Sequence, residues 1–240
     1  MIKIINFITY LLVLECAFVI HEYGHFTEMR KRSVEVAEFS LGIGPALYKY
    51  QADGFIVSLR AIPVMAYVAP SKKGEEKINS NLSRFDRFLI YSAGVRNNTL
   101  SAVMVILILE LMGLVSGYIT LKELLITALV APIRIILLFV SFVIDIFTFN
   151  VINLGNNFAL PTGEFMPPKL VKTFLMISLL LGFFNALPLY PLDGGKIFLD
   201  NIANFISQER IALIRSFSPY VVIVFAITYR RSMKFFDFET

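Results

Sequence analysis

Residues 4–26, with the sequence IINFITYLLVLECAFVIHEYGHF, form an apolar stretch long enough to cross a lipid bilayer as one helix. Near its end, the segment His21-Glu22-Tyr23-Gly24-His25 contains the only 2 histidines of the chain. Side chains four residues apart project from the same face of a helix, separated by roughly 40° of rotation. The spacing therefore predicts that His21 and His25 offer their imidazole nitrogens to one metal ion, with Glu22 beside them as a general base.

An HExxH pattern also occurs by chance on soluble helices, so its surroundings decide how it is interpreted. An ionisable side chain at the centre of a membrane helix is disfavoured by roughly 2.5–3.5 kcal/mol, and such residues are retained mainly for function. Packing alone does not account for His21, Glu22 and His25 so close together in this stretch. We therefore favour metal binding over a structural role for the segment.

The composition of the 240-residue chain is that of a polytopic membrane protein, since 57% of its residues are hydrophobic and 17% are charged. A soluble domain carries roughly a quarter of charged residues. The net charge of +4 does not indicate nucleic acid, because most of the basic residues lie between apolar stretches, where the positive-inside rule and anionic lipid headgroups account for them. We expect the lipid bilayer, and no nucleic acid, as a partner. The single cysteine, Cys16, excludes an intrachain disulfide and a zinc site built from several cysteines.

We expect an α-helical polytopic membrane protein that forms a single domain over residues 1–240, with a four-helix core that extends to six if further segments cross. A small membrane-associated β-hairpin or sheet is expected between the first two spans. The expected elements are spans at about 4–27, 87–118, 170–187 and 210–229, with the β-region at about 39–69. Residues 122–150 are apolar but contain Pro132, Arg134 and Asp145, so we expect an amphipathic or re-entrant segment that crosses zero or two times.

The loop between the first two spans is basic, since residues 30–87 contain ten lysines and arginines. The positive-inside rule places such a loop in the cytoplasm. We therefore expect a multi-pass protein of the plasma membrane whose site lies near the cytoplasmic side.

A catalytic zinc site needs three protein ligands and an open position for water. With both histidines used, the third ligand is an oxygen or Cys16. The best-placed oxygen lies in the run from Asn185 to Gly195, NALPLYPLDGG, which closes an apolar helix. Its prolines end regular helix, its paired glycines allow close backbone approach, and Asp193 is costly there unless it is paired or bound to metal.

HEYGH in a first membrane helix, followed by NALPLYPLDGG near the end of a later one, resembles the site-2 protease family of intramembrane zinc metalloproteases. The resemblance implies that His21, His25 and Asp193 bind one zinc ion per chain. Glu22 then activates a water molecule. Asn185 is expected to bind the substrate backbone or the developing oxyanion, although a role in holding helices together stays open.

Three further residues are candidates for supporting roles. The segment AGVRNN at 93–98 is similar to the AGPxxN pattern of the family's second core helix and places Asn98 at the asparagine position. Gly194 belongs to the LDGG run itself. Glu15 lies seven residues before Glu22, faces nearly the same way, and is expected either to support the site or to pair with a neighbouring helix.

The resemblance covers about residues 1–100 and 170–205, and it departs from the family at Val95, where a proline is usual. The loop between the first two spans is too short and too apolar for a PDZ domain, so we expect a short member without PDZ domains. The implied reaction is hydrolysis of a peptide bond within or near a membrane-spanning segment of another protein, as in regulated intramembrane proteolysis. The substrate helix must unwind, and the β-region at 45–68 offers an edge for strand addition.

Two alternatives from other classes stay open: a non-catalytic membrane scaffold of the same fold, and a metal-ion transporter. The intact set of His21, Glu22, His25 and Asp193 disfavours the scaffold. Internal repeats, which are frequent in transporters, are not found in the sequence. The sequence identifies neither the substrate nor the oligomeric state.

Overall fold

The computed structural model of the chain describes residues 2–147 and 169–230. Helices and a bent two-stranded antiparallel sheet make up these residues, which confirms the expected fold class. The elements in chain order are α1 (Ile2–Lys31), β1 (Val36–Ala52), β2 (Phe55–Pro70), α2 (Lys72–Glu76), a π-helical turn (Lys77–Asn81), α3 (Arg84–Tyr91), α4 (Ala93–Val115), α5 (Leu121–Phe147), α7 (Lys169–Ala186), α8 (Asp193–Ile202) and α9 (Gln208–Arg230).

Four of the described helices are long and apolar enough to cross a membrane. They are Ile4–Lys31, Ala93–Val115, Leu121–Ile144 and Lys169–Ala186. The predicted span 210–229 corresponds to α9, whose side chains are described only as far as residue 221, so its crossing stays a prediction.

The structure differs from the predicted elements in one place. The span predicted over 87–118 is two helices, α3 and α4, which meet at Ser92. Residues 121–147 form one continuous helix, α5, and residues 148–150 lie outside the described part, so the amphipathic or re-entrant character predicted for 122–150 stays a prediction. Pro132 lies inside α5 without ending it, and the buried residues around it pack against the neighbouring spans, which offsets the lost backbone hydrogen bond.

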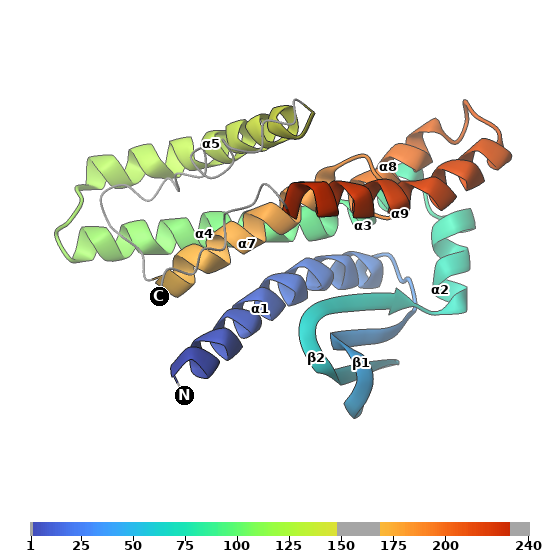
Figure 1. Cartoon of the computed structure of the whole chain (residues 1–240), viewed down its shortest axis with the longest axis horizontal. Coiled ribbons are helices and arrows are strands. Elements are labelled where there is room, and N and C mark those ends of the chain that lie inside the picture. Colours follow the sequence, from blue (N-terminus) through green and yellow to red (C-terminus); the bar gives the residue numbers. More distant parts are fainter. Residues whose placement is uncertain (1, 148–168, 231–240) are drawn as a thin grey trace.

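The helices α1, α4, α5 and α7 lie side by side, and α4 runs opposite to the other three (Figure 1). α1 runs from left to right, α4 returns, and α5 and α7 again run from left to right. α1 packs against both α4 and α7, and α4 packs against α5. The sheet, α2, α3 and α8 gather at the right-hand end, where α1 ends and α4 begins. This arrangement brings the ends of α1 and α7 together although they are far apart in the sequence.

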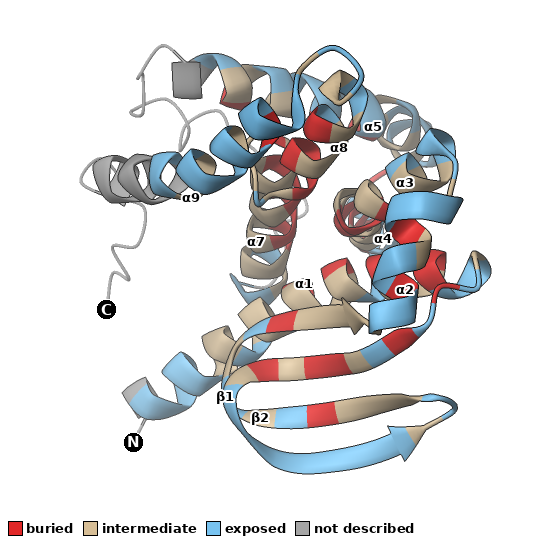
Figure 2. Cartoon of the chain, turned by 90° about the vertical axis from the view of Figure 1, so that its right-hand side faces the viewer, coloured by how far each residue is buried: buried red, intermediate tan, exposed pale blue. Residues whose placement is uncertain are grey.

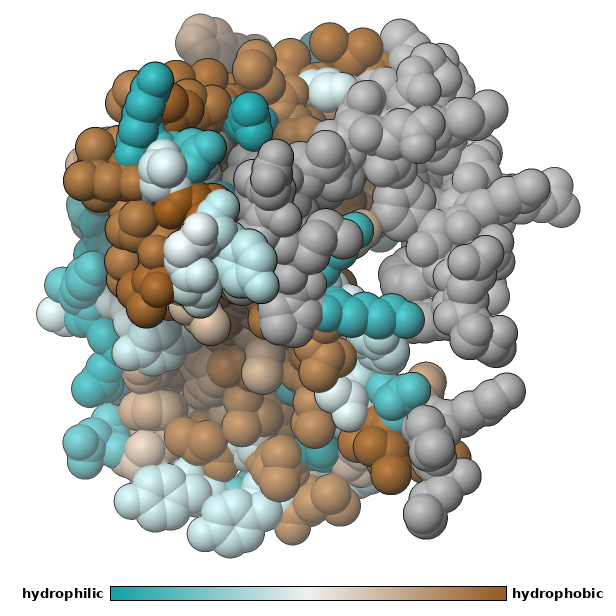
Figure 3. Space-filling model, turned by 90° about the vertical axis from the view of Figure 1, so that its left-hand side faces the viewer, coloured by the Kyte–Doolittle hydropathy of each residue, from teal (hydrophilic) through white to brown (hydrophobic). Residues whose placement is uncertain are grey.

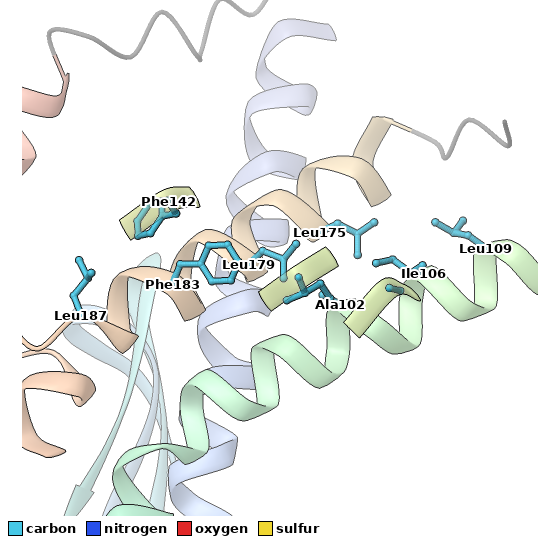
Figure 4. Close-up of a cluster of buried hydrophobic side chains, with 10 residues drawn as sticks. Ala102, Ile106, Leu109, Phe142, Leu175, Leu179, Phe183 and Leu187 are labelled. Carbon is cyan, nitrogen blue, oxygen red and sulfur yellow. The ribbon is translucent and has the colours of Figure 1, made fainter. Parts of the chain in front are cut away.

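A buried apolar cluster fixes α7 against α4 and α5 (Figure 4). It consists of Ala102, Ile106, Leu109, Ala131, Ile135, Phe142, Leu175, Leu179, Phe183 and Leu187. In a bilayer such contacts stabilise through close packing, because lipid tails are as apolar as the side chains. On the face shown in Figure 3, brown, hydrophobic residues predominate among the coloured atoms. Exposed side chains such as Phe7, Met104 and Leu129 therefore face lipid.

The sheet is built from two long strands that fold back on themselves (Figure 2). The first part of β1 pairs with both ends of β2, since Phe39 faces Val68 on one side and Val57 on the other. The chain bends at Gly42, whose φ of 83° favours glycine. The last part of β2, residues 62–70, thereby becomes an edge next to α1, while residues 46–52 of β1 form the opposite edge.

Candidate metal centre

His21 and His25 lie on one face of α1, and both side chains are buried. The aspartate at the start of α8 lies opposite them: its Oδ2 is 3.0 Å from Nε2 of His21 and 2.9 Å from Nε2 of His25. One ligand atom from each of the three residues lies within 4.8 Å of the others, the only such group in the described residues. The structure thus brings Asp193 to two histidines that precede it by 172 and 168 residues along the chain.

Two glycines allow Asp193 to approach. A Cβ added at Gly194 would lie 2.2 Å from the carbonyl oxygen of Ala186, and one at Gly195 would lie 2.3 Å from the carbonyl carbon of Leu189. The start of α8 therefore packs directly on the backbone of the end of α7 and of the loop that follows it, which only residues without a side chain permit. This places Gly194 beside the site through packing.

Backbone and side-chain groups engage the remaining atoms of His25 and Asp193. Nδ1 of His25 lies 2.8 Å from the carbonyl oxygen of Ile90, to which its N–H donates. Nζ of Lys196 donates to Oδ1 of Asp193 at 3.0 Å, so that Oδ2 alone faces the histidines. Burial alone would raise the pKa of the Asp193 carboxyl, but the charge of His25 and the hydrogen bonds from both histidines outweigh it and lower that pKa well below its ordinary value.

The donor set fits a divalent cation. Because Nδ1 of His25 already donates to a carbonyl, its Nε2 faces Asp193 either with a second proton or with a lone pair directed at a cation. Two imidazole nitrogens and one carboxylate oxygen are the ligand types that zinc accepts in catalytic sites. The outer contacts to Ile90 and Lys196 are of the kind that orient such ligands.

Glu22 lies next to the two histidines on α1 and also touches the sheet. The backbone N–H of Val68 donates to its Oε2 at 3.1 Å. Val68 belongs to the edge of β2, so this hydrogen bond joins the predicted general base to the edge strand.

Three other residues that were considered for the site from the sequence lie outside the group of His21, His25 and Asp193. The side chain of Asn185 donates to the carbonyl of Leu181 on its own helix at 2.9 Å. Glu15 lies near the backbone of Gly42 and, in the described residues, makes no hydrogen bond to the three ligands. Cys16, the open alternative for the third ligand, is exposed on α1 and is not part of the group.

Four contributors were missed in the sequence. Val68 and Ile90 act through backbone atoms, which no residue pattern reveals. Lys196 lies three residues after Asp193 on the same helix, and this spacing was a usable signal. Gly94 lies against the ring of His21, since a Cβ there would be 2.3 Å from Nε2.

Ion pairs connect the helices around the metal centre, α1 with α4 and α3 with α8. Glu28, buried on α1, accepts from Arg96 of α4 at 2.7 Å and also pairs with Arg32. This explains an arginine early in a membrane helix. Arg87 of α3 pairs with Asp200 of α8 at 2.9 Å, which holds the helix that carries Asp193.

Comparison with known proteins identifies the family of the chain. The family model described as Peptidase family M50 matches residues 9–228. A putative zinc metalloprotease of Nostoc sp. (all3971) is 37% identical over 103 residues, which are 40% of this chain and 28% of the relative. One of Synechocystis sp. (slr1821) is 39% identical over 98 residues, 38% of this chain and 27% of the relative. Membrane metalloprotease ARASP, chloroplastic, of Arabidopsis thaliana is 31% identical over 104 residues, 40% of this chain and 23% of the relative. The matched part thus spans less than a third of each relative.

Proposed function

The chain belongs to peptidase family M50, and from this premise we propose that it is an intramembrane zinc metalloprotease that cleaves other membrane proteins within or near their spans. The observation that carries the proposal is the convergence of His21, His25 and Asp193 beside Glu22, at the end of an apolar helix. The metalloprotease names of the relatives agree with it.

His21, His25 and Asp193 would hold the zinc ion, which when bound lowers the pKa of a water molecule and polarises a carbonyl group. Lys196 keeps the second oxygen of Asp193 engaged, and Ile90 keeps the ring of His25 oriented.

Glu22 would take the proton of the attacking water on its carboxylate and pass it to the leaving amine. The hydrogen bond from Val68 fixes one oxygen of this carboxylate and leaves the other for the proton. Asn185 would bind the substrate backbone or the developing oxyanion once its side chain turns away from the carbonyl of Leu181.

The substrate class follows from the place of the site. A transmembrane substrate helix hides its carbonyls in its own hydrogen bonds, so the scissile segment has to unwind. The edge at residues 62–70 of β2 passes Glu22 and offers unpaired backbone groups to an extended segment. Of the predicted region 45–68, we therefore assign strand addition to the part that lies on this edge, residues 62–68. The basic residues around the sheet favour the cytoplasmic side of a plasma membrane, and regulated intramembrane proteolysis is the process that such cleavage serves.

Purified protein in lipid vesicles with a single-span substrate tests the function. We expect cleavage mapped by mass spectrometry to fall within or near the span, to stop with a chelator and to resume with zinc. A scaffold would give no cleavage, and a transporter would move zinc into the vesicles without cleaving. Either result would overturn the proposal.

The edge of β2 yields a separate prediction. Backbone N–H groups two residues apart in a strand point the same way, so the N–H of Ala66 points to the same side as that of Val68. Ala66→Pro removes this donor, and we expect cleavage to slow by about tenfold or more with zinc content unchanged. On the opposite edge, proline at whichever of Tyr48 and Lys49 has its N–H directed away from the sheet is the matched control and should leave the rate unchanged. Equal slowing at both edges would count against strand addition.

A further inference from the structure

Asn98 contacts the ring of His21 from the side opposite Asp193. Its side chain is fully buried on α4, and its Nδ2 lies 3.5 Å from Nδ1 of His21. Its Oδ1 is buried and has no hydrogen-bond partner in residues 2–147 and 169–230. A buried amide oxygen without a partner is uncommon and calls for an explanation.

The explanation follows from the two forms of a neutral imidazole. In the form that donates from Nε2 of His21 to the Asp193 carboxylate 3.0 Å away, Nδ1 has a lone pair and accepts from the Asn98 amide. A histidine that binds a metal through Nε2 needs its lone pair there and carries the proton on Nδ1. The amide NH₂ would then face an N–H, and two donors cannot bond to each other.

We propose that Asn98 is the positioning residue of His21: with the cation bound, its amide is turned over and Oδ1 accepts a hydrogen bond from Nδ1–H of His21. The inference rests on the proposed function, because the cation is the one that this function requires. A half-turn about the last side-chain bond exchanges nitrogen and oxygen without moving the rest of the residue.

The surroundings of Asn98 support this role. Its backbone carbonyl accepts from the hydroxyls of Ser101 at 2.9 Å and Ser178 at 3.4 Å, which anchors the residue between α4 and α7. His25 already has a matching acceptor in the carbonyl of Ile90 at 2.8 Å. Each histidine would thus donate from Nδ1 to one fixed oxygen, an arrangement that metal-binding histidines commonly show.

Zinc affinity measured by competition with a chromogenic chelator tests the proposal. We expect Asn98→Ala to weaken zinc binding about 10- to 100-fold, the usual effect of removing such a partner. Asn98→Asp keeps an acceptor but loses the donor, so its affinity should stay at or above that of the wild type. Asn97→Ala is the matched control, because the side chain of Asn97 donates to the backbone of Ile20 at 3.3 Å and makes no hydrogen bond to His21 among the described residues.

Nitrogen-15 NMR of histidine-labelled protein gives a second readout on the wild-type chain, since only 2 histidines contribute signals. We expect zinc to move the proton of His21 from Nε2 to Nδ1, and the resulting N–H signal to shift in Asn98→Asp. Wild-type affinity in Asn98→Ala, equal losses in Asn98→Asp and Asn98→Ala, or an unprotonated Nδ1 in the zinc form would each overturn the proposal alone. Failure of the wild type to bind zinc would instead overturn the proposed function.

Discussion

Glu22→Gln should abolish peptide hydrolysis, lowering the rate by about 10³-fold or more, while zinc stays bound. Glutamine has nearly the same shape, and its amide oxygen still accepts from the backbone of Val68. It cannot take a proton from water, so the general-base step is lost. The three ligand residues are unchanged, which is why metal content should not fall.

The measurement is the cleavage rate in vesicles together with zinc content of the same preparation. Glu76→Gln makes the same chemical change on the exposed helix α2 and should leave both values unchanged. Cleavage by Glu22→Gln at more than a tenth of the wild-type rate would show that another group is the base. In cells, the inactive form should accumulate membrane-protein stubs that the active form removes.

Gly94→Ala should remove both zinc and activity while the fold is retained. The added Cβ would lie 2.3 Å from Nε2, 2.5 Å from Cε1 and 2.6 Å from Cδ2 of His21. The ring has to leave this position, and with it the nitrogen that faces Asp193. Because the clash is with a side chain that can rotate, the backbone of α1 and α4 need not move.

Gly182→Ala provides the control within the same helix bundle. A Cβ there would be 3.6 Å from its nearest neighbour, an ordinary contact, so zinc and activity should be kept. Zinc content and thermal unfolding of both variants decide the matter. Full zinc in Gly94→Ala would mean that His21 does not bind the metal from the position seen here.

The first membrane helix and the candidate metal ligands could be predicted from the sequence, because they depend on residue spacing and on local composition. The first membrane helix was predictable from the apolar length of residues 4–26. The shared face of His21 and His25 was predictable from their spacing of four residues in the HEYGH segment. The family match confirms the recognition that these segments carried. Asp193 was selected because a lone carboxylate after an apolar helix is costly without a partner, and the structure places it against both histidines.

Contacts between distant elements could not be predicted in this way. The hydrogen bonds from Val68 to Glu22 and from His25 to Ile90 depend on where a strand and a helix end dock. α5 is continuous through Pro132, and packing on α4 stabilises it there, while the predicted zero or two crossings of residues 122–150 stay a prediction. The side chain of Asn185 donates to the backbone carbonyl of Leu181 on its own helix, so its role in substrate binding stays a prediction.

The most direct test is the zinc content of the purified wild type and of the variants His21→Ala, His25→Ala and Asp193→Ala. If these side chains jointly hold the ion, the wild type carries one zinc per chain and each variant carries almost none. Folded Asp193→Ala protein with the wild-type amount of zinc would show that the carboxylate between the two rings is not a ligand, and the assignment of this centre would be wrong.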